Sequence, residues 1–114
     1  ESERQRVLAE GEALLAKGSL AHGHLWFHND AMRSSVRARA YAEAERYAQA
    51  LERFVAPEPL AWAVFGIEVT RLCCRAARGE RGAALQAELR RLQDDATRQG
   101  YLRDLINLNL IEVT

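Results

Sequence analysis

Cysteine is almost absent from this sequence. Two cysteines occur in 114 residues, and they are neighbours, Cys73 and Cys74. Adjacent cysteines cannot build a disulfide framework, so the composition favours a reducing compartment and predicts a cytoplasmic location. The pair also lacks the CxxC spacing of redox and metal sites. Because a buried free cysteine behaves as a small hydrophobic residue, we expect one of the two to pack in the core and the other to lie at its edge.

An excess of charge of either sign is also lacking. Sixteen basic and sixteen acidic residues give a formal net charge of zero. Binding to nucleic acid or to an anionic membrane needs a basic excess on one face, so we expect neither partner. No apolar run approaches the roughly 20 residues of a membrane span, and no signal peptide is visible. The length fits one domain, residues 1–114. Because the chain does not begin with methionine, we expect a fragment of a longer protein.

Proline is scarce, and its position marks the segment around which the chain is organised. Both prolines, Pro57 and Pro59, precede an uncharged run at residues 60–67. They end the preceding helix and start a central one that Gly79 stops. A helix that is apolar on nearly all sides must be covered by its neighbours, so we expect Trp62 in the core. Apolar residues at helical spacing predict six helical segments, at about residues 2–18, 19–39, 41–55, 59–78, 82–99 and 101–110.

Two of these segments have less regular patterns. The second helix has an inward stripe of mostly small residues: Leu20, Gly23 or His24, Phe27, Ala31, Ser34 or Ser35, and Ala38. The last segment has apolar residues at helical spacing near its start, but from Ile106 to Leu110 they alternate with asparagines, as in a strand. We expect a helix to about Leu110, with the strand as the alternative.

The helical segments repeat along the chain. Leu20 and Ala21 align with Leu60 and Ala61 at an offset of 40 residues. In the third and fifth helices an offset of 41 aligns one apolar set with another: Ala44, Ala48 and Leu51 with Leu85, Leu89 and Leu92. A period near 40 made of paired helices is typical of an α-solenoid. The sequence therefore predicts an all-α protein of five or six helices, built from antiparallel helical hairpins stacked as a short, degenerate tetratricopeptide-like solenoid.

Few residues have the spacing that catalysis or metal binding requires. His24 and His28 lie four residues apart and could share a helix face, as in helical zinc sites. Zinc needs three or four ligands, and no further ligand lies suitably close in the sequence. Residues 11–18 superficially resemble a phosphate loop, but Ala16 and Gly18 stand where glycine and serine or threonine belong. We therefore expect no catalytic residue, no cofactor and no metal, and do not expect an enzyme.

Five residues are candidates for binding a protein or peptide partner: Trp26, His28, Arg71, Arg75 and Arg78. Trp26 and Phe27 cannot both point inward, so Trp26 either packs against a flanking helix or lies in a groove as a binding anchor. The three arginines follow one stripe of the central helix. They could bind an acidic peptide, or they could pair with nearby glutamates, as such ridges more often do.

Three stretches resemble one known family. They are His24-Leu-Trp-Phe-His-Asn-Asp-Ala-Met32, Glu45-Arg-Tyr-Ala-Gln-Ala-Leu-Glu52 and Pro57-Glu-Pro-Leu-Ala-Trp62. Together they are similar to the tetratricopeptide-like C-terminal region of large bacterial signalling proteins, in which a class III adenylate/guanylate cyclase or regulatory domain and a P-loop ATPase precede helical repeats. The resemblance covers roughly residues 10–105. The period near 40 rather than 34, and the missing Trp-Leu-Gly-Tyr pattern, depart from a regular tetratricopeptide repeat and put its peptide groove in doubt.

The resemblance implies a scaffold or sensor segment that relays partner binding to an enzyme elsewhere in a longer chain. The expected function is thus a non-catalytic helical-repeat scaffold for protein–protein interaction. One alternative is a homodimerisation module, because the C-terminal segment is unusually apolar for a terminus. The other is a small-molecule or metal-sensing helical domain that uses the histidine cluster.

Overall fold

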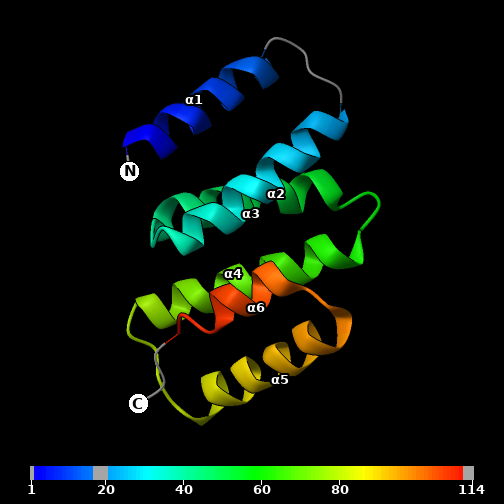
Figure 1. Cartoon of the computed structure of the whole chain (residues 1–114). Helices are drawn as coiled ribbons and strands as arrows, with labels where there is room; N and C mark the ends of the chain where they lie inside the picture. The colour runs from blue at the N-terminus through cyan, green and yellow to red at the C-terminus, as the bar shows by residue number, and fades with distance from the viewer. Residues whose placement is uncertain (1, 17–20, 112–114) are drawn as a thin grey trace.

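The computed structural model describes residues 2–16 and 21–111, and within these ranges it contains helices and no strand (Figure 1). The helices are α1 (Ser2–Ala16), α2 (Ala21–Arg37), α3 (Tyr41–Val55), α4 (Ala61–Ala77), α5 (Ala83–Gln99) and α6 (Leu102–Leu108). The predicted all-α class with five or six helices is confirmed, and the last segment is helical to Leu108. The predicted end of the first helix at Gly18 and the cap at Ser19 lie outside the described residues.

The two hairpins that the sequence predicts are α2–α3 and α4–α5, and the structure repeats between them. Helices α2 and α4 end 40 residues apart, at Arg37 and Ala77. Successive helices run antiparallel, and the hairpins stack one on the next (Figure 1). Buried residues of α3 and α5 correspond at an offset of 41: Ala44, Ala48, Leu51 and Val55 match Leu85, Leu89, Leu92 and Ala96.

Helix α4 joins two clusters of buried side chains, as its apolar run predicts. One cluster includes Leu8, Met32, Tyr47, Leu51 and Ile67, from α1, α2, α3 and α4. The other includes Val36, Ala44, Leu72, Leu92 and Leu108, from α2, α3, α4, α5 and α6. The covering of α4 is incomplete, because the Val64 side chain is 39% exposed.

The inward stripe of α2 is broader than the sequence pattern predicts. Ala31 and Ser35 are buried as expected, but Met32 and Val36 are buried as well. Ala38, predicted to face inward, is exposed because α2 ends at Arg37. The stripe widens because α2 is covered by α3 on one side and by α4 and α6 on another.

The prediction for the cysteines is wrong in one respect. Cys73 and Cys74 are both buried, rather than one in the core and one at its edge. The Cys73 thiol donates to the carbonyl oxygen of Asn107 at 3.7 Å, and the Cys74 thiol donates to that of Tyr41 at the same distance. Both cysteines are therefore covered, because α6 packs over Cys73 and the start of α3 packs over Cys74. Burial is the main cause that raises the pKa of the Cys73 thiol to about 12.

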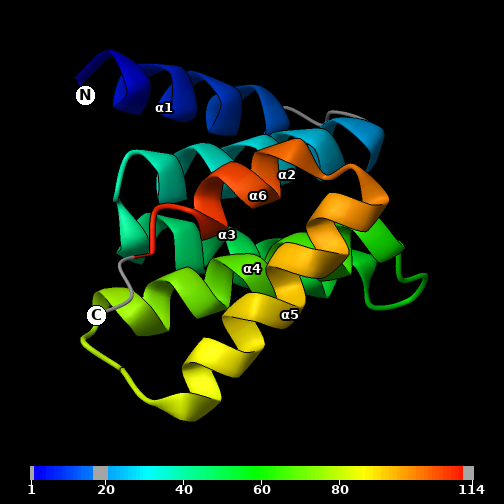
Figure 2. The same cartoon turned by 60° about the horizontal axis from the view of Figure 1, so that its bottom comes forward.

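Helix α6 folds back over the hairpins instead of extending the stack. Figure 2 shows it lying between α5 and α2 and crossing above α4, and it contacts all three helices. Leu108 is completely buried, so this short helix closes one of the two core clusters. None of the six helices, within the described residues, has the length and apolar character needed to cross a membrane.

Helix α2 ends in a Schellman motif that places an arginine in a left-handed conformation. The amide of Ala40 donates to the carbonyl of Ser35 at 2.8 Å, and the amide of Arg39 donates to that of Val36 at 2.9 Å. Arg39 has a φ of 61°. The equivalent position after α4, 40 residues later, is Gly79 with a φ of 97°. Glycine adopts this conformation without steric cost, whereas an arginine does not.

We therefore expect Arg39→Gly to raise the free energy of unfolding by about 0.5–1 kcal/mol. Relief of left-handed strain is worth about 1–2 kcal/mol, and the added flexibility of glycine in the unfolded chain offsets part of it. Urea denaturation measures the change. The control is Arg90→Gly, at an exposed position inside α5, which should instead destabilise by about 0.5–1 kcal/mol. Equal destabilisation by both substitutions would contradict the assignment of strain to Arg39.

Candidate functional site

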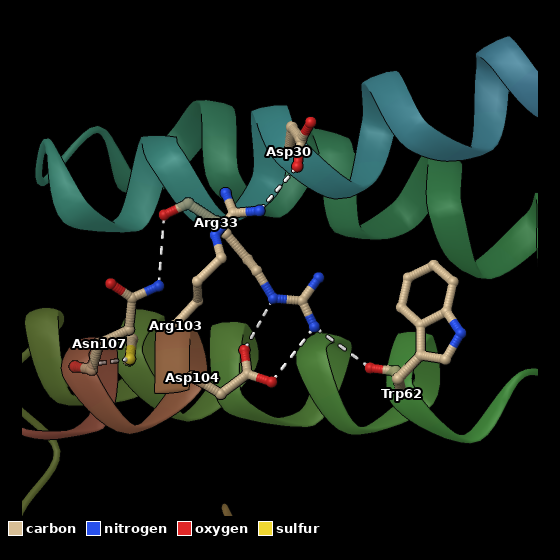
Figure 3. Close-up of polar contacts among 7 residues, drawn as sticks. Asp30, Arg33, Trp62, Arg103, Asp104 and Asn107 are labelled. Carbon is tan, nitrogen blue, oxygen red and sulfur yellow. Dashed lines mark hydrogen bonds and ion pairs between the residues drawn. The ribbon is translucent and has the colours of Figure 1, made fainter. Parts of the chain in front are cut away.

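A buried ion pair joins α6 to α2. Arg33 Nε lies 2.9 Å from Asp104 Oδ1, and Arg33 Nη2 lies 3.2 Å from Oδ2, so the pairing is bidentate (Figure 3). The two side chains are 7% and 2% exposed. Nη2 also donates to the main-chain oxygen of Trp62 at 3.2 Å. The guanidinium thus links α2, α4 and α6 at one point, because its donors reach all three.

Two further polar contacts fix α6 beside this pair. Asn107, one helical turn after Asp104, donates from Nδ2 to the carbonyl oxygen of Arg33 at 3.2 Å. At the surface, Arg103 Nη1 lies 2.7 Å from Asp30 Oδ1 (Figure 3). The outer pair is more than half exposed and the inner one is buried. The two Arg–Asp pairs between α2 and α6 therefore differ chiefly in their exposure to solvent.

The guanidinium of Arg33 occupies space that a side chain at Gly66 would need. A Cβ atom on Gly66 would lie 2.2 Å from Arg33 Nη2 and 2.7 Å from Cζ. Helix α4 can approach α2 at this level because residue 66 has no side chain. Glycine normally weakens a helix interior. At position 66 glycine lowers the helix propensity of α4, but it leaves the space that the Arg33 guanidinium occupies.

A cavity of about 350 Å³ opens beside the ion pair. Its lining includes Asn29 and Arg33 from α2, Trp62 from α4, and Tyr101 and Asp104 around the start of α6. Two of the buried polar atoms of these residues, Asn29 Oδ1 and Arg33 Nη1, have no hydrogen-bond partner within the described part of the chain. Buried polar atoms are nearly always paired in folded proteins. Both atoms are fully enclosed, so they lie in the packing beside the cavity and do not open to it.

Two tryptophans stack next to the cavity. The ring centroids of Trp26 and Trp62 lie 5.3 Å apart, with the planes 12° from parallel. Trp26 is 44% exposed, so it packs against a flanking helix and still presents part of its indole at the surface. Trp62 was expected in the core, but it is only partly buried and packs against the edge of a core cluster. Its indole stacks on the exposed Trp26 at the edge of that cluster instead of pointing into it.

His28, another predicted partner-binding residue, belongs to an aromatic group inside the α2–α3 hairpin. Its ring packs near those of Phe27 and Tyr47, and Nδ1 lies 2.7 Å from the main-chain oxygen of His24. The ring of His24 stacks on His28 and on Phe54. Within the described residues, no group of three or more His, Cys, Asp or Glu side chains is arranged to hold a metal ion.

The three predicted arginines lie in ion pairs with glutamates. Both terminal nitrogens of Arg71 lie 2.8 Å from Glu52. Arg75 pairs with Glu80 and Glu88, and Arg78 pairs with Glu45. Arg71 also lines a separate shallow groove between α3 and α4, of about 260 Å³. The structure therefore does not bring these arginines into the site that Trp26 and Trp62 flank.

Sequence reasoning missed the residues at the centre of this site: Asn29, Arg33 and Asp104. The sequence contained a signal for these residues, because Asn29 and Arg33 are four residues apart and share one face of α2 with the apolar Val36. Asp104 similarly precedes Leu108 by four residues on the inward face of α6. A charged residue within an apolar stripe indicates a buried partner. Which partner it has depends on how α6 folds back, and periodicity does not show that.

Fold and site together define an all-helical repeat protein with a small aromatic-flanked cavity. In comparisons with known proteins, no family model, curated sequence or solved structure matched this chain.

Proposed function

We propose that this chain is a non-catalytic helical-repeat scaffold that binds a protein or peptide partner. The 40-residue structural repeat of helical hairpins supports a scaffold, because stacked hairpins expose long continuous surfaces. The single observation that carries the proposal is the cavity beside the Trp26–Trp62 stack. Tryptophan is enriched at sites that dominate binding energy, where it combines apolar area with few rotamers to lose.

The proposed context is a larger bacterial signalling protein of the cyclase or P-loop ATPase type, acting in the cytoplasm. It rests on the resemblance of the three stretches in α2, α3 and the start of α4. In that context the segment transmits partner binding to an enzyme located elsewhere in the longer chain. Trp26 is the partner-binding residue that we favour, whereas Arg71, Arg75 and Arg78 would first have to leave their glutamates.

Selection from a random peptide library displayed on phage tests the proposal. Peptides enriched on the wild-type chain should bind with micromolar Kd and should lose at least tenfold in affinity on Trp26→Ala. The matched control is Phe54→Ala, which removes an aromatic side chain of similar exposure, 37%, that stacks on His24 rather than on the tryptophans. Failure to enrich any peptide, or equal losses on the two variants, would contradict a binding site at the tryptophan stack.

Homodimerisation is the main alternative. The position of α6 in the structure weakens the support for it. The C-terminal segment was expected to expose apolar residues, but Leu108 is completely buried against α4 and α5. Ile106 and Leu110 remain 42% and 37% exposed. Light scattering at tens of micromolar distinguishes the two proposals, since a mass of two chains that Ile106→Ser lowers would favour dimerisation through α6.

A further inference from the structure

We infer that a cavity at the C-terminal ends of α2, α4 and α6 is a subsite for a carboxylate, the side chain of an aspartate or glutamate on a partner peptide. This inference rests on the proposed function, because the partner supplies the carboxylate. The three helices end on the same side of the molecule, at the left in Figure 1. The cavity has a volume of about 200 Å³, and two exposed arginines, Arg39 and Arg81, contribute to its lining.

These two arginines lack the carboxylate partner that most arginines of the chain have. Within residues 2–16 and 21–111, the arginines that form no ion pair with Asp or Glu are Arg37, Arg39, Arg53, Arg81 and Arg90. Arg81 donates from Nη1 to the main-chain oxygens of Ala76, at 2.9 Å, and Glu80. Ala76 also lines the cavity, so this contact holds the Arg81 guanidinium beside it.

The charges around the cavity leave an excess of positive charge. The C-terminus of a helix carries about half a negative charge, so three helix ends do not cancel two guanidinium groups. The nearby carboxylates of the described chain are already paired: Glu80 with Arg75, and Asp104, one turn before the cavity-lining Asn107, with Arg33. Two cations beside one small cavity also repel each other. An anion bound between them would relieve this repulsion.

The backbone of Arg39 supports a role in binding. Its φ of 61° is left-handed, and glycine occupies the equivalent position after α4. The last turn of α2 already has a basic residue, Arg37, so Arg39 is not needed to complement that helix end. Its guanidinium has no hydrogen-bond partner in the described part of the chain that would offset the strain. Strained residues cluster at ligand sites, where they are retained for function. Contact with a carboxylate would account for an arginine at this position.

A carboxylate on a short aliphatic stem matches both parts of the lining. The planar fork of a guanidinium donates two parallel N–H groups to the two oxygens of a carboxylate. Burial raises the pKa of the Tyr41 hydroxyl, and the charge of Arg39 opposes that rise, so the cation lies near a neutral hydroxyl that can also donate. The volume is several times the roughly 30 Å³ share of one water molecule. Apolar side chains are available to contact the methylene groups of the stem: Val36, Ala76, Leu110 and Ile111.

An NMR titration of the ¹⁵N-labelled chain, residues 1–114, at low ionic strength tests the inference. N-acetyl-glutamate methylamide should give saturable shifts of the Nε–H signals of Arg39 and Arg81. N-acetyl-glutamine methylamide, which has the same shape without the charge, should bind at least tenfold more weakly. The Nε–H signals of Arg53 and Arg90 are internal controls, because these exposed arginines also lack a carboxylate partner. Equal shifts at all four arginines, or no saturable shift, would overturn the subsite.

Inorganic phosphate serves as a third probe, because it is the other anion that guanidinium groups bind well. Weaker binding of phosphate than of the glutamate probe would support a carboxylate site. Binding of phosphate at least as tight as that of the glutamate probe would instead assign the cavity to a phosphoryl group and overturn the carboxylate.

A pair of glycine variants adds a second test. Arg39→Gly should fold, since it relieves the left-handed strain, and it should bind the glutamate probe at least tenfold more weakly than the wild type. Arg90→Gly removes an equal charge from an exposed position in α5 and should leave binding within twofold of the wild type. A purely structural Arg39 would not affect binding in a folded variant. Equal binding of the probe by the two variants would therefore contradict the inference.

The outcome separates this inference from the proposed function. Peptides selected on the phage library that depend on Trp26, but contain no preferred acidic residue and bind Arg39→Gly as tightly as the wild type, would support the scaffold and overturn the carboxylate subsite. Saturable binding of the glutamate probe without any selected peptide would support the subsite and contradict the scaffold's peptide site.

Discussion

Asp104→Ala should lower the free energy of unfolding by about 3–5 kcal/mol, the loss typical of breaking a buried ion pair by removing one partner. The substitution leaves the Arg33 cation buried between α2 and α4 without its carboxylate. Among the described residues, the main-chain oxygen of Trp62 is the acceptor that would still receive a hydrogen bond from it. A single domain of this size is usually stable by 5–15 kcal/mol, so the variant would lose a large part of its stability. Urea denaturation followed by circular dichroism measures the change.

The outer Arg–Asp pair provides a matched control, because it joins the same two helices. Asp30→Ala removes the partner of Arg103, and both of these side chains are more than half exposed. Exposed pairs contribute about 0–1 kcal/mol, so this variant should unfold almost like the wild type. If Asp104→Ala costs no more than Asp30→Ala, then the inner pair is not a buried ion pair in solution.

Removal of both charges should restore stability. The double variant Arg33→Met/Asp104→Leu removes both charges of the pair, and buried pairs replaced by apolar residues are often neutral or stabilising. We expect its free energy of unfolding to lie within about 2 kcal/mol of the wild type and above that of Asp104→Ala. The pair would then contribute to specificity, by fixing where α6 docks, more than to net stability. A double variant less stable than the single one would contradict this.

Gly66→Ala is expected to have the second-largest effect. The new Cβ would lie 2.2 Å from Arg33 Nη2, so the guanidinium must move away from Asp104 or α4 must move away from α2. Overpacking of this kind typically costs about 1–3 kcal/mol. The cost should appear even though alanine is favoured over glycine in a helix interior by about 1 kcal/mol. Thermal and urea unfolding measure the loss.

The Arg33→Met/Asp104→Leu background shows whether the collision with Arg33 is the cause. A methionine side chain is flexible and can yield to an added methyl group, so Gly66→Ala should be neutral or stabilising there. The difference between the two backgrounds is a coupling energy, which we expect to be about 1–3 kcal/mol. Equal effects of Gly66→Ala in both backgrounds would mean that residue 66 is restricted by something other than Arg33.

The sequence by itself determined the helices and their repetition. Pro57 and Pro59 separate α3 from α4, and Gly79 and Gly100 follow the ends of α4 and α5, because these residues act through local backbone geometry. The offset of 41 residues between the apolar stripes of α3 and α5 is likewise local information, since side chains three and four residues apart share a helix face. These features required no knowledge of which helices touch.

Only the tertiary structure decided where α6 lies, and the site depends on that position. Arg33 and Asp104 are 71 residues apart in the sequence, and no periodicity within either helix indicates that they meet. The same fold-back buries Leu108, which the sequence left as an exposed apolar residue near the terminus, and covers Cys73. The exposure of Trp62 also depends on packing, because its ring lies against Trp26 of α2 at the edge of a core cluster. Contacts between distant segments depend on how the helices pack. The sequence alone therefore could not predict the ion pair or the cavity beside it.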